Sequence, residues 1–228
     1  MRSSRRGVVD PFIVMDVMES ARQAEEAGRH IIHMEVGQPG TPAPAGARAA
    51  LTQAMEAGNL GYTVALGLPE LRARIARLYL DWYGVTIDPE RIVITPGSSG
   101  GFILAFTALF DAGARVGVPE PGYPSYRQIL KALDLVPVGI ATSQENRLQP
   151  APDDLAGMAL DGLMVASPAN PSGTMLGREA LGALIGACDA AGISFISDEI
   201  YHGVQYEDRA VSALEISDDV YVINSFSK

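Results

Sequence analysis

The residues in this sequence that could do chemistry stand directly after short apolar runs. Lys228 supplies an amine at the end of Ser225-Phe226-Ser227-Lys228, and Asp198 supplies a carboxylate where the apolar run that starts at Ser194 ends. A buried, unpaired carboxylate is costly, so Asp198 needs a cationic partner such as a protonated heterocyclic nitrogen. The two groups indicate acid–base and nucleophilic chemistry on a heterocyclic ligand.

Four further residues or segments could complete such a site. The turn Thr95–Gly101 opens a helix whose backbone N–H groups suit a phosphate, although the same composition is typical of a plain turn. Tyr123 either stacks on a ring or packs beneath its proline turn. Asn170 stands between two prolines that restrict its backbone, and Tyr201 adds a phenol three residues after Asp198.

The elements that must position these groups are short apolar runs that alternate with helical segments. Six such runs in this order predict an α/β fold with a mostly parallel sheet and helices on both faces. Ligands of open α/β sheets bind at the carboxyl ends of the strands, which is where the residues above stand. The predicted strands are Ile92–Thr95, Arg115–Val118, Val136–Ile140, Leu163–Ala166, Ser194–Asp198 and Val220–Asn224.

The segment before the predicted sheet contains two helical patterns. Asp10 and Pro11 resemble an N-cap and a first helical residue, and Gly28 resembles a stop, so the pattern predicts a helical arm over residues 10–28. A second, amphipathic helix is predicted from Pro69 to Trp82, with the arginines at 72, 74 and 77 away from its apolar face.

Composition limits the classes of partner. The chain has 228 residues, 47% of them apolar, and a formal net charge of −10, which disfavours nucleic acid and anionic membranes and favours a small molecule. No apolar run approaches the length of about 20 residues that spans a bilayer. The single cysteine, Cys188, is predicted to be a small core residue, and a reducing, cytoplasmic location fits.

One cofactor uses all of these groups. Pyridoxal 5'-phosphate needs a phosphate cradle, an aromatic stacking face, an anion at its ring nitrogen, donors to its phenolate oxygen and a lysine for its aldehyde. The sequence resembles the fold-type-I pyridoxal-phosphate enzymes, class I/II aminotransferases related to aspartate aminotransferase. The resemblance rests on the segments Ala169–Gly173, Asp198–Tyr201 and Ser225–Lys228, with Gly61–Thr63 and Gly67–Arg72 ahead of them.

The resemblance implies roles for the residues around the cofactor ring. Lys228 would bind the aldehyde and act as general base, and Asp198 would keep the ring nitrogen protonated. Asn170 and Tyr201 would hydrogen-bond the phenolate oxygen, and Tyr123 would stack on the ring.

The resemblance also implies how the phosphate and the substrate are bound. Ser98, Ser99 and Ser225 would hold the phosphate, with Tyr62 reaching it from the partner subunit of a homodimer. Gly37 matches a mobile loop near the substrate carboxylate, where Asn170 would also bind. No metal is predicted.

The family pattern continues beyond the lysine with a phosphate-binding arginine, a further strand and a carboxyl-terminal small domain. We therefore expect residues 1–42 to be an arm and loop of the small domain, and residues 43–228 to be an incomplete cofactor-binding large domain. We further expect this chain to be a fragment that is inactive alone.

The expected activity is transfer of an amino group between a 2-amino acid and a 2-oxo acid. A carbon–sulfur lyase or a related synthase of the same fold remains the alternative, because the fold alone does not choose the reaction. A non-catalytic sensor domain is a third reading. Neither the identity of the amino acid nor that of the oxo acid follows from these residues.

Overall fold

The computed structural model describes residues 4–37, 40–58, 61–206 and 208–228 of the chain. The chain divides into two compact units. The first unit comprises Met1–Phe12, Arg77–Ile87 and Thr95–Lys228, and the second comprises Ile13–Ala76 and Asp88–Ile94.

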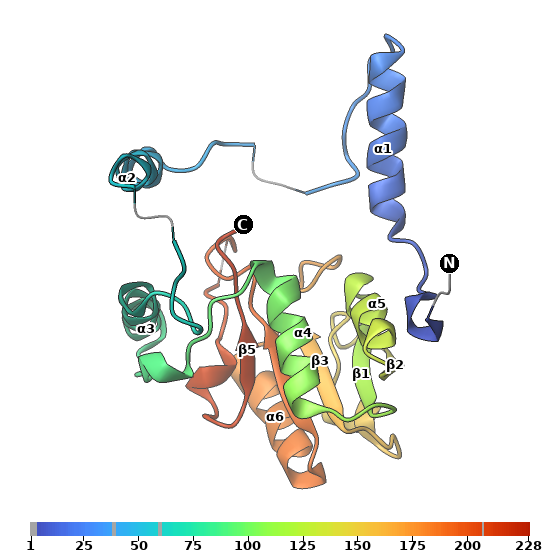
Figure 1. Ribbon diagram of the computed structural model, residues 1–228. Coiled ribbons are helices and arrows are strands. Elements are labelled where there is room, and N and C mark those ends of the chain that lie inside the picture. The colour runs from blue at the N-terminus through green and yellow to red at the C-terminus, as the bar shows by residue number, and fades with distance from the viewer. Residues whose placement is uncertain (1–3, 38–39, 59–60, 207) are drawn as a thin grey trace. The chain divides into compact units, whose positions relative to one another are not determined.

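The first unit is built on a five-stranded sheet in the order β2-β1-β3-β4-β5 (Figure 1). Every pair of neighbouring strands is parallel. The strands match five of the predicted apolar runs to within a few residues, and the predicted α/β class is confirmed. Their bounds are β1 Arg115–Glu120, β2 Val136–Ala141, β3 Gly162–Ala166, β4 Ser194–Asp198 and β5 Tyr221–Ile223.

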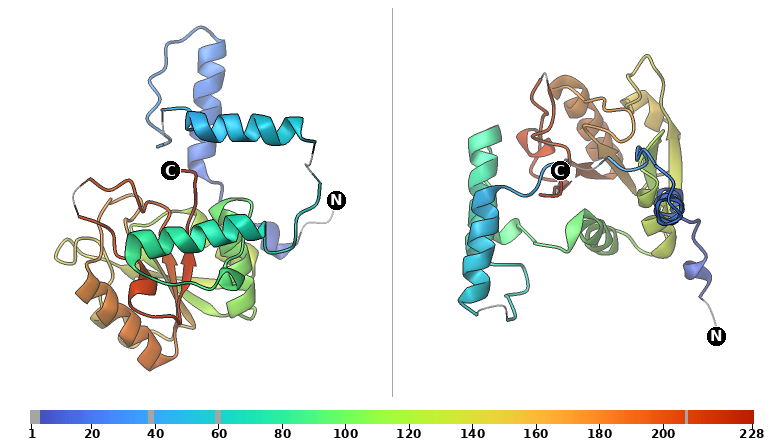
Figure 2. Two further views of the ribbon diagram at one scale, coloured as in Figure 1. Left: turned by 90° about the vertical axis from the view of Figure 1, so that its left-hand side faces the viewer. Right: turned by 90° about the horizontal axis from the view of Figure 1, so that it is seen from above.

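Helices cover both faces of this sheet. The helices α4 (Gly97–Leu109) and α5 (Ser125–Ala132) pack on one face, and α6 (Arg178–Ala191) packs on the other, as the view from above shows (Figure 2). Two separate apolar clusters result, because alternate residues of a strand point to opposite faces. In β3, Met164 belongs to the α4 and α5 cluster, and Leu163 belongs to the α6 cluster.

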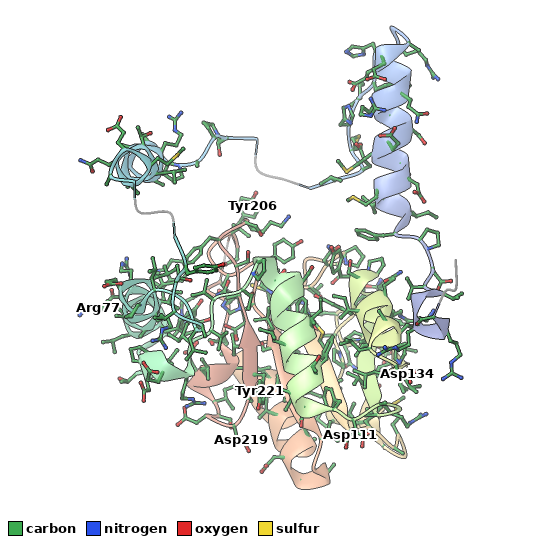
Figure 3. The ribbon with its side chains drawn as sticks, in the orientation of Figure 1. Arg77, Asp111, Asp134, Tyr206, Asp219 and Tyr221 are labelled. Atoms are coloured by element: carbon green, nitrogen blue, oxygen red, sulfur yellow. The ribbon has the colours of Figure 1, made fainter. Side chains whose placement is uncertain are left out.

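The strands begin on one side of the sheet and end on the opposite side. In Figure 3, Asp111 and Asp219 lie where strands begin, and Tyr206 lies beyond the opposite edge, where strands end. All candidate residues that follow a strand therefore come from one edge, because parallel strands end on the same side.

Three short helices and the last turns of α3 complete the first unit. The short helices are η1 (Arg5–Gly7), η3 (Pro152–Leu155) and η4 (Ala213–Glu215), and residues 77–83 of α3 belong to this unit. Cys188 is fully buried in the cluster under α6, and burial raises the pKa of its thiol to about 11, so its prediction as a core residue is confirmed.

The second unit contains helices and connecting segments. It holds α1 (Ile13–Glu26), α2 (Ala45–Glu56), the first part of α3 (Pro69–Tyr83) and η2 (Pro89–Arg91). Gly67 is required where the chain enters α3: its φ is +103°, and an added Cβ would lie 2.3 Å from a side-chain carbon of Ile94.

Three sequence expectations for the helical segments meet different outcomes. Gly28 ends the first helix in the left-handed region, with φ +82°, as predicted. The helix begins at Ile13 and not at Asp10, because the Asp10 carboxylate binds the Lys131 ammonium at 2.6 Å and does not cap the helix. Arg72, predicted to lie away from the apolar face, is nevertheless buried: it is 6% exposed and donates to Pro89 O and Glu90.

The segment Ile92–Thr95 is extended but is not a strand. Its Ile94 N–H donates to Leu66 O at 2.9 Å, and a single such bond does not make a ladder. Among the described residues, no helix has both the length and the apolar composition needed to cross a membrane.

Candidate functional site

The candidate site is assembled from the segments that leave β1, β3, β4 and β5. The aligned registers of β3, β4 and β5 bring Ala166, Asp198 and Ile223 to neighbouring positions at the carboxyl edge. The loops that continue from these residues carry the predicted site residues, and the backbone N–H of Ser167 donates to Asp198 O at 3.2 Å.

Asp198 is a buried carboxylate whose recorded partners carry no formal charge. It is 3% exposed, accepts a hydrogen bond from the Tyr126 hydroxyl, and accepts another from the Ile200 N–H at 3.1 Å. Burial raises the pKa of Asp198, and the two hydrogen bonds lower it by less. A cation next to this side chain would remove the cost of burial, which is what the sequence predicted for Asp198.

Tyr126 is a functional candidate that the sequence did not reveal. It lies in the first turn of α5, is 4% exposed, and stacks edge-on against Tyr123 with ring centroids 5.3 Å apart. Burial, followed by the charge of Asp198, raises the pKa of the Tyr126 phenol, so this hydroxyl stays a donor. Its position three residues after Tyr123, where the turn runs into α5, is the signal that could have identified it.

Asn170 and Lys228 both approach Tyr201. The Asn170 side-chain amide donates to the Tyr201 hydroxyl at 3.4 Å, and the Lys228 Nζ lies 5.9 Å from the centroid of the Tyr201 ring. Burial raises the pKa of Tyr201 most, the Asn170 amide lowers it, and Asp198 and Tyr123 raise it further. An amide, a phenol and an amine therefore share one small region.

Tyr123 is packed against aromatic neighbours, and its role in stacking on a ring stays a prediction. It lies in the turn after β1 and packs against Tyr126 and, edge-on, against Phe12 at 5.7 Å. It also lines a small pocket together with Tyr126 and Asn170. A packing role does not exclude a stacking role, because Tyr123 contributes to the lining of this pocket.

The predicted phosphate cradle is the first turn of α4. Ser98 and Ser99 follow Gly97, which has φ +74°, and the cap residue Pro96 contributes no side-chain hydrogen bond to the helix start. The turn lies against β5, because a Cβ on Gly101 would be 3.3 Å from Ile223 Cδ1. The dipole of α4 therefore begins beside the end of β5.

Ser225 lies in a tight turn after β5. Its hydroxyl donates to Ser227 Oγ at 3.0 Å and accepts from the Ser227 N–H at 3.1 Å, and its own N–H donates to Asn224 Oδ1 at 2.7 Å. These bonds order the backbone that leads to Lys228.

Glu199 and His202, in the segment that follows Asp198, are buried loop residues. Glu199 is 0% exposed and His202 is 8% exposed, and both are hydrogen-bonded. Burial raises the pKa of Glu199 to about 7 and lowers the pKa of His202 to about 4. The sequence could not show this, because the residues that cover them come from α3 and from the chain after Ala210.

Two predicted site residues belong to the second unit. Tyr62 is fully exposed there, and Gly37 is exposed. Their roles toward a partner subunit and toward a substrate stay predictions.

Comparisons with known proteins agree over nearly the whole chain. The family described as aminotransferase class I and II matches residues 29–228. The valine–pyruvate aminotransferase of Mycobacterium tuberculosis (strain ATCC 25618 / H37Rv) is 46% identical over 231 residues, which cover 100% of this chain and 60% of that protein.

Solved structures agree in fold as well as in sequence. A crystal structure from Silicibacter pomeroyi is 68% identical and has a TM-score of 0.92, with 100% of this chain and 59% of that chain covered. The aspartate aminotransferase from Thermus thermophilus with maleate is 27% identical with a TM-score of 0.94, and the match covers 100% and 61% of the two chains. The chain thus spans about 60% of the length of these relatives.

Proposed function

This chain belongs to the class I and II aminotransferase family, and from this membership we propose that the protein transfers an amino group from a 2-amino acid to a 2-oxo acid with pyridoxal 5'-phosphate as cofactor. The observation that carries the proposal is the buried carboxylate of Asp198, whose hydrogen-bond donors among the described residues are uncharged. Its charge acts on Tyr201, which Asn170 and Lys228 approach.

The residues present fit this cofactor by their chemistry. A buried carboxylate that lacks a charged partner suits a protonated ring nitrogen, and a helix start with no side-chain cap suits a phosphate. The sequence holds only two lysines, and the ammonium of Lys131 pairs with Asp10 at 2.6 Å. In this sequence Lys228 is therefore the candidate for the aldehyde.

When bound, the cofactor supplies an electron sink that lets a proton leave the substrate Cα. Asp198 would hold a proton at the ring nitrogen, assisted by the hydrogen bond from Tyr126. Asn170 and Tyr201 would donate to the phenolate oxygen, and the ring face of Tyr123 would exclude water from one side. The Lys228 amine would bind the aldehyde and afterwards carry the Cα proton as general base.

Further residues would bind the phosphate and the substrate. Ser98 and Ser99 would bind the phosphate through backbone N–H groups, together with the Ser225 hydroxyl. In a homodimer, Tyr62 of one protomer would reach the phosphate site of its partner. Gly37, with Asn170, would lie near the substrate carboxylate.

The proposal concerns the whole protein, and it includes the domain assignment and the location. Residues 1–42 would belong to a small domain and residues 43–228 to the cofactor-binding domain, in a cytoplasmic enzyme. The relative named valine–pyruvate aminotransferase is more similar to this chain than the relatives named aspartate aminotransferase, at 46% against 27–31% identity. An aliphatic 2-amino acid with pyruvate is therefore the first substrate pair to test.

The test is an absorbance titration of the full natural protein with pyridoxal phosphate. We expect a lysine-dependent band near the visible edge that is lost in Lys228→Ala, that bleaches when valine is added and that returns when pyruvate is added. Lys131→Ala is the matched control, because it removes the other lysine of this sequence and should keep the band.

The outcomes separate the reactions. Release of pyruvate and ammonia from an amino acid in the absence of any oxo acid would favour the lyase. A band that Lys228→Ala leaves intact would contradict the assignment of this lysine, and the absence of any band in the natural protein would contradict the cofactor.

A further inference from the structure

A buried polar cluster lies directly behind the candidate site and is used by none of the roles above. Its centre is Glu199, the residue after Asp198, which is 0% exposed. The Glu199 N–H donates to Ile223 O at 2.8 Å and so ties the end of β4 to the end of β5. A buried carboxylate with no catalytic assignment calls for a physical reason.

The two carboxylate oxygens of Glu199 have different surroundings. Oε1 accepts three hydrogen bonds, from Ser197 Oγ at 3.2 Å, Ser212 Oγ at 3.1 Å and the Ala213 N–H at 2.8 Å. Oε2 has no hydrogen-bond partner among the described residues. Oε2 is therefore the oxygen that carries the proton when Glu199 is protonated, and the oxygen that attracts donors when it is not.

His202 does not supply that donor in its neutral form. Its Nε2 lies 2.9 Å from Ser167 O, and a carbonyl only accepts, so the ring proton is on Nε2. Nδ1 is then an acceptor, and the Tyr83 hydroxyl donates a hydrogen bond to it, with an O···N distance of 2.8 Å. Nδ1 lies 3.6 Å from Glu199 Oε2, but it has no proton to offer.

Tyr79 is the remaining donor near Glu199. Its ring packs against the Tyr83 ring with centroids 5.2 Å apart, and the Tyr83 hydroxyl binds the His202 Nδ1 that lies 3.6 Å from Glu199 Oε2. Burial first, and the charge of Glu199 second, raise the pKa of both phenols. The Tyr79 oxygen accepts a hydrogen bond from Asn224 Nδ2 at 3.2 Å, so its own proton remains available to Glu199.

Asn224 extends this chain of contacts to the segment that would bind the cofactor. Its amide nitrogen binds Tyr79, and its amide oxygen accepts the Ser225 N–H at 2.7 Å. The side chain is thus held at both ends, between the last turns of α3 and the backbone of Ser225. Ser225 is in turn hydrogen-bonded to Ser227, the residue before Lys228, so Asn224 is linked by hydrogen bonds to the turn that leads to Lys228.

We propose that Glu199, acting through Tyr79 and Asn224, is a positioning residue for the segment Ser225–Lys228, and that the charge on Glu199 sets how firmly this segment is held. The inference rests on the proposed function for the purpose of the segment, but the mechanical link is independent of any cofactor. An ionised Glu199 attracts the Tyr79 proton and leaves the phenol lone pairs for Asn224. A protonated Oε2 is itself a donor, and it competes with Asn224 for the same phenol oxygen.

The groups that face Glu199 come from four segments. Asp198 precedes it on β4, His202 follows it, and Tyr79 and Tyr83 face it from α3. Arg209 lies 5.2 Å from the centre of the Tyr83 ring and pairs with Glu215, and both influence His202. Any pH dependence of the segment must be compared with a variant that changes Glu199 alone.

The experiment is hydrogen exchange of the backbone amides of residues 225–228 in the cofactor-free, full natural protein, between about pH 6 and pH 8. Tyr79→Phe removes the acceptor for Asn224, and we expect exchange at these amides to accelerate about tenfold, the effect of one lost hydrogen bond. Glu199→Gln keeps the volume and places an amide donor at the position of Oε2, so it imitates the protonated acid. In this variant we expect the amides of residues 225–228 to exchange faster than in the natural protein. The only remaining pH dependence should be that of amide exchange in an unstructured peptide.

Two controls make the result decisive. Tyr221→Phe, at the start of β5, makes the same chemical change at an exposed side chain and should leave residues 225–228 unchanged. Met164 and Val165, in the central strand β3, report general opening. Acceleration confined to residues 225–228 supports the proposal, whereas equal acceleration in β3, or wild-type exchange in Tyr79→Phe, overturns it.

The affinity of each variant for pyridoxal phosphate separates this proposal from the proposed function. If exchange changes as expected but no variant shows a lysine-dependent band, the positioning link stands and the cofactor assignment fails. If the natural protein shows the band and Tyr79→Phe matches it in both exchange and affinity across the pH range, only the positioning link fails.

Discussion

At the scale of single residues, Asp198 depends on a side chain 72 positions away in the sequence. The hydroxyl of Tyr126 donates to one of its oxygens, and this hydrogen bond lowers the pKa of the buried carboxyl, in opposition to the larger effect of burial. The anion at this position is therefore maintained by a neutral donor in addition to whatever cation the site binds.

We predict that Tyr126→Phe raises the pKa of Asp198, because the variant removes the hydrogen bond that the Tyr126 hydroxyl donates to Asp198 Oδ2. Loss of such a bond costs about 1–3 kcal/mol of the free energy of unfolding at neutral pH, and amino-group transfer should fall by about tenfold or more. Urea unfolding and steady-state kinetics measure the two effects. Tyr206→Phe, at an exposed tyrosine, is the control, and equal behaviour of both variants would show that the bond does not support Asp198.

Sequence patterns identified the residues at this site that stand at strand ends, but not those that reach them through space. Asp198 is the last residue of β4, and Asn170 and Lys228 stand a few residues after β3 and β5, so their position relative to the sheet could be inferred. Tyr126 and Glu199 owe their importance to hydrogen bonds with distant segments, which no local pattern encodes. The partners of Glu199, for example, include the N–H of Ala213.

At the scale of elements, strands were more predictable than helix boundaries. The strands of a parallel sheet are buried on both faces, and this gives continuous apolar runs such as Leu163–Ala166. Ile92–Thr95 has the same appearance but makes only one backbone hydrogen bond to another segment, with Leu66. The sequence did not predict α2, Ala45–Glu56, because it has no buried residue and so no strong apolar stripe.

Glycines within elements provide a test of the packing between α4 and β3. At Gly162, the first residue of β3, a Cβ would lie 2.2 Å from Phe110 Cζ. Gly162→Ala should therefore destabilise the protein by about 1–3 kcal/mol through overpacking. Gly186, within α6, has nothing within 4 Å of an added Cβ, and Gly186→Ala should stabilise by about 0.5–1 kcal/mol because alanine favours the helix. Thermal unfolding measures both, and shifts in the same direction would contradict the packing described for β3.

At the scale of the whole molecule, Glu199 and His202 make opposite contributions to the dependence of stability on pH. The pKa of Glu199 is raised from about 4.5 to about 7, so its contribution to stability is present below pH 4.5 and is lost as pH rises through 7. The pKa of His202 is lowered from about 6.5 to about 4, so its contribution is present above pH 6.5 and is lost as pH falls through 4. Between these limits the two effects oppose each other.

Each pKa differs from its ordinary value by about 2.5, and one pKa unit corresponds to about 1.36 kcal/mol, so each contribution is roughly 3 kcal/mol. In the natural protein, the summed contribution of Glu199 and His202 to the free energy of unfolding should therefore vary little between about pH 4.5 and pH 6.5. Glu199→Gln removes one side of this balance, and its free energy of unfolding should rise with pH across that interval.

His202→Gln removes the other side, and its free energy of unfolding should fall as pH rises from about 4.5 to 7, because only the burial of Glu199 then remains. Urea unfolding at a series of pH values measures both slopes. If the free energy of unfolding changes with pH in opposite directions in the two variants, both Glu199 and His202 titrate in the folded protein. Their Oε2 and Nδ1 atoms lie 3.6 Å apart there. If both variants kept the slope of the natural protein, groups elsewhere would control its response to pH, and neither burial would matter for stability in this range.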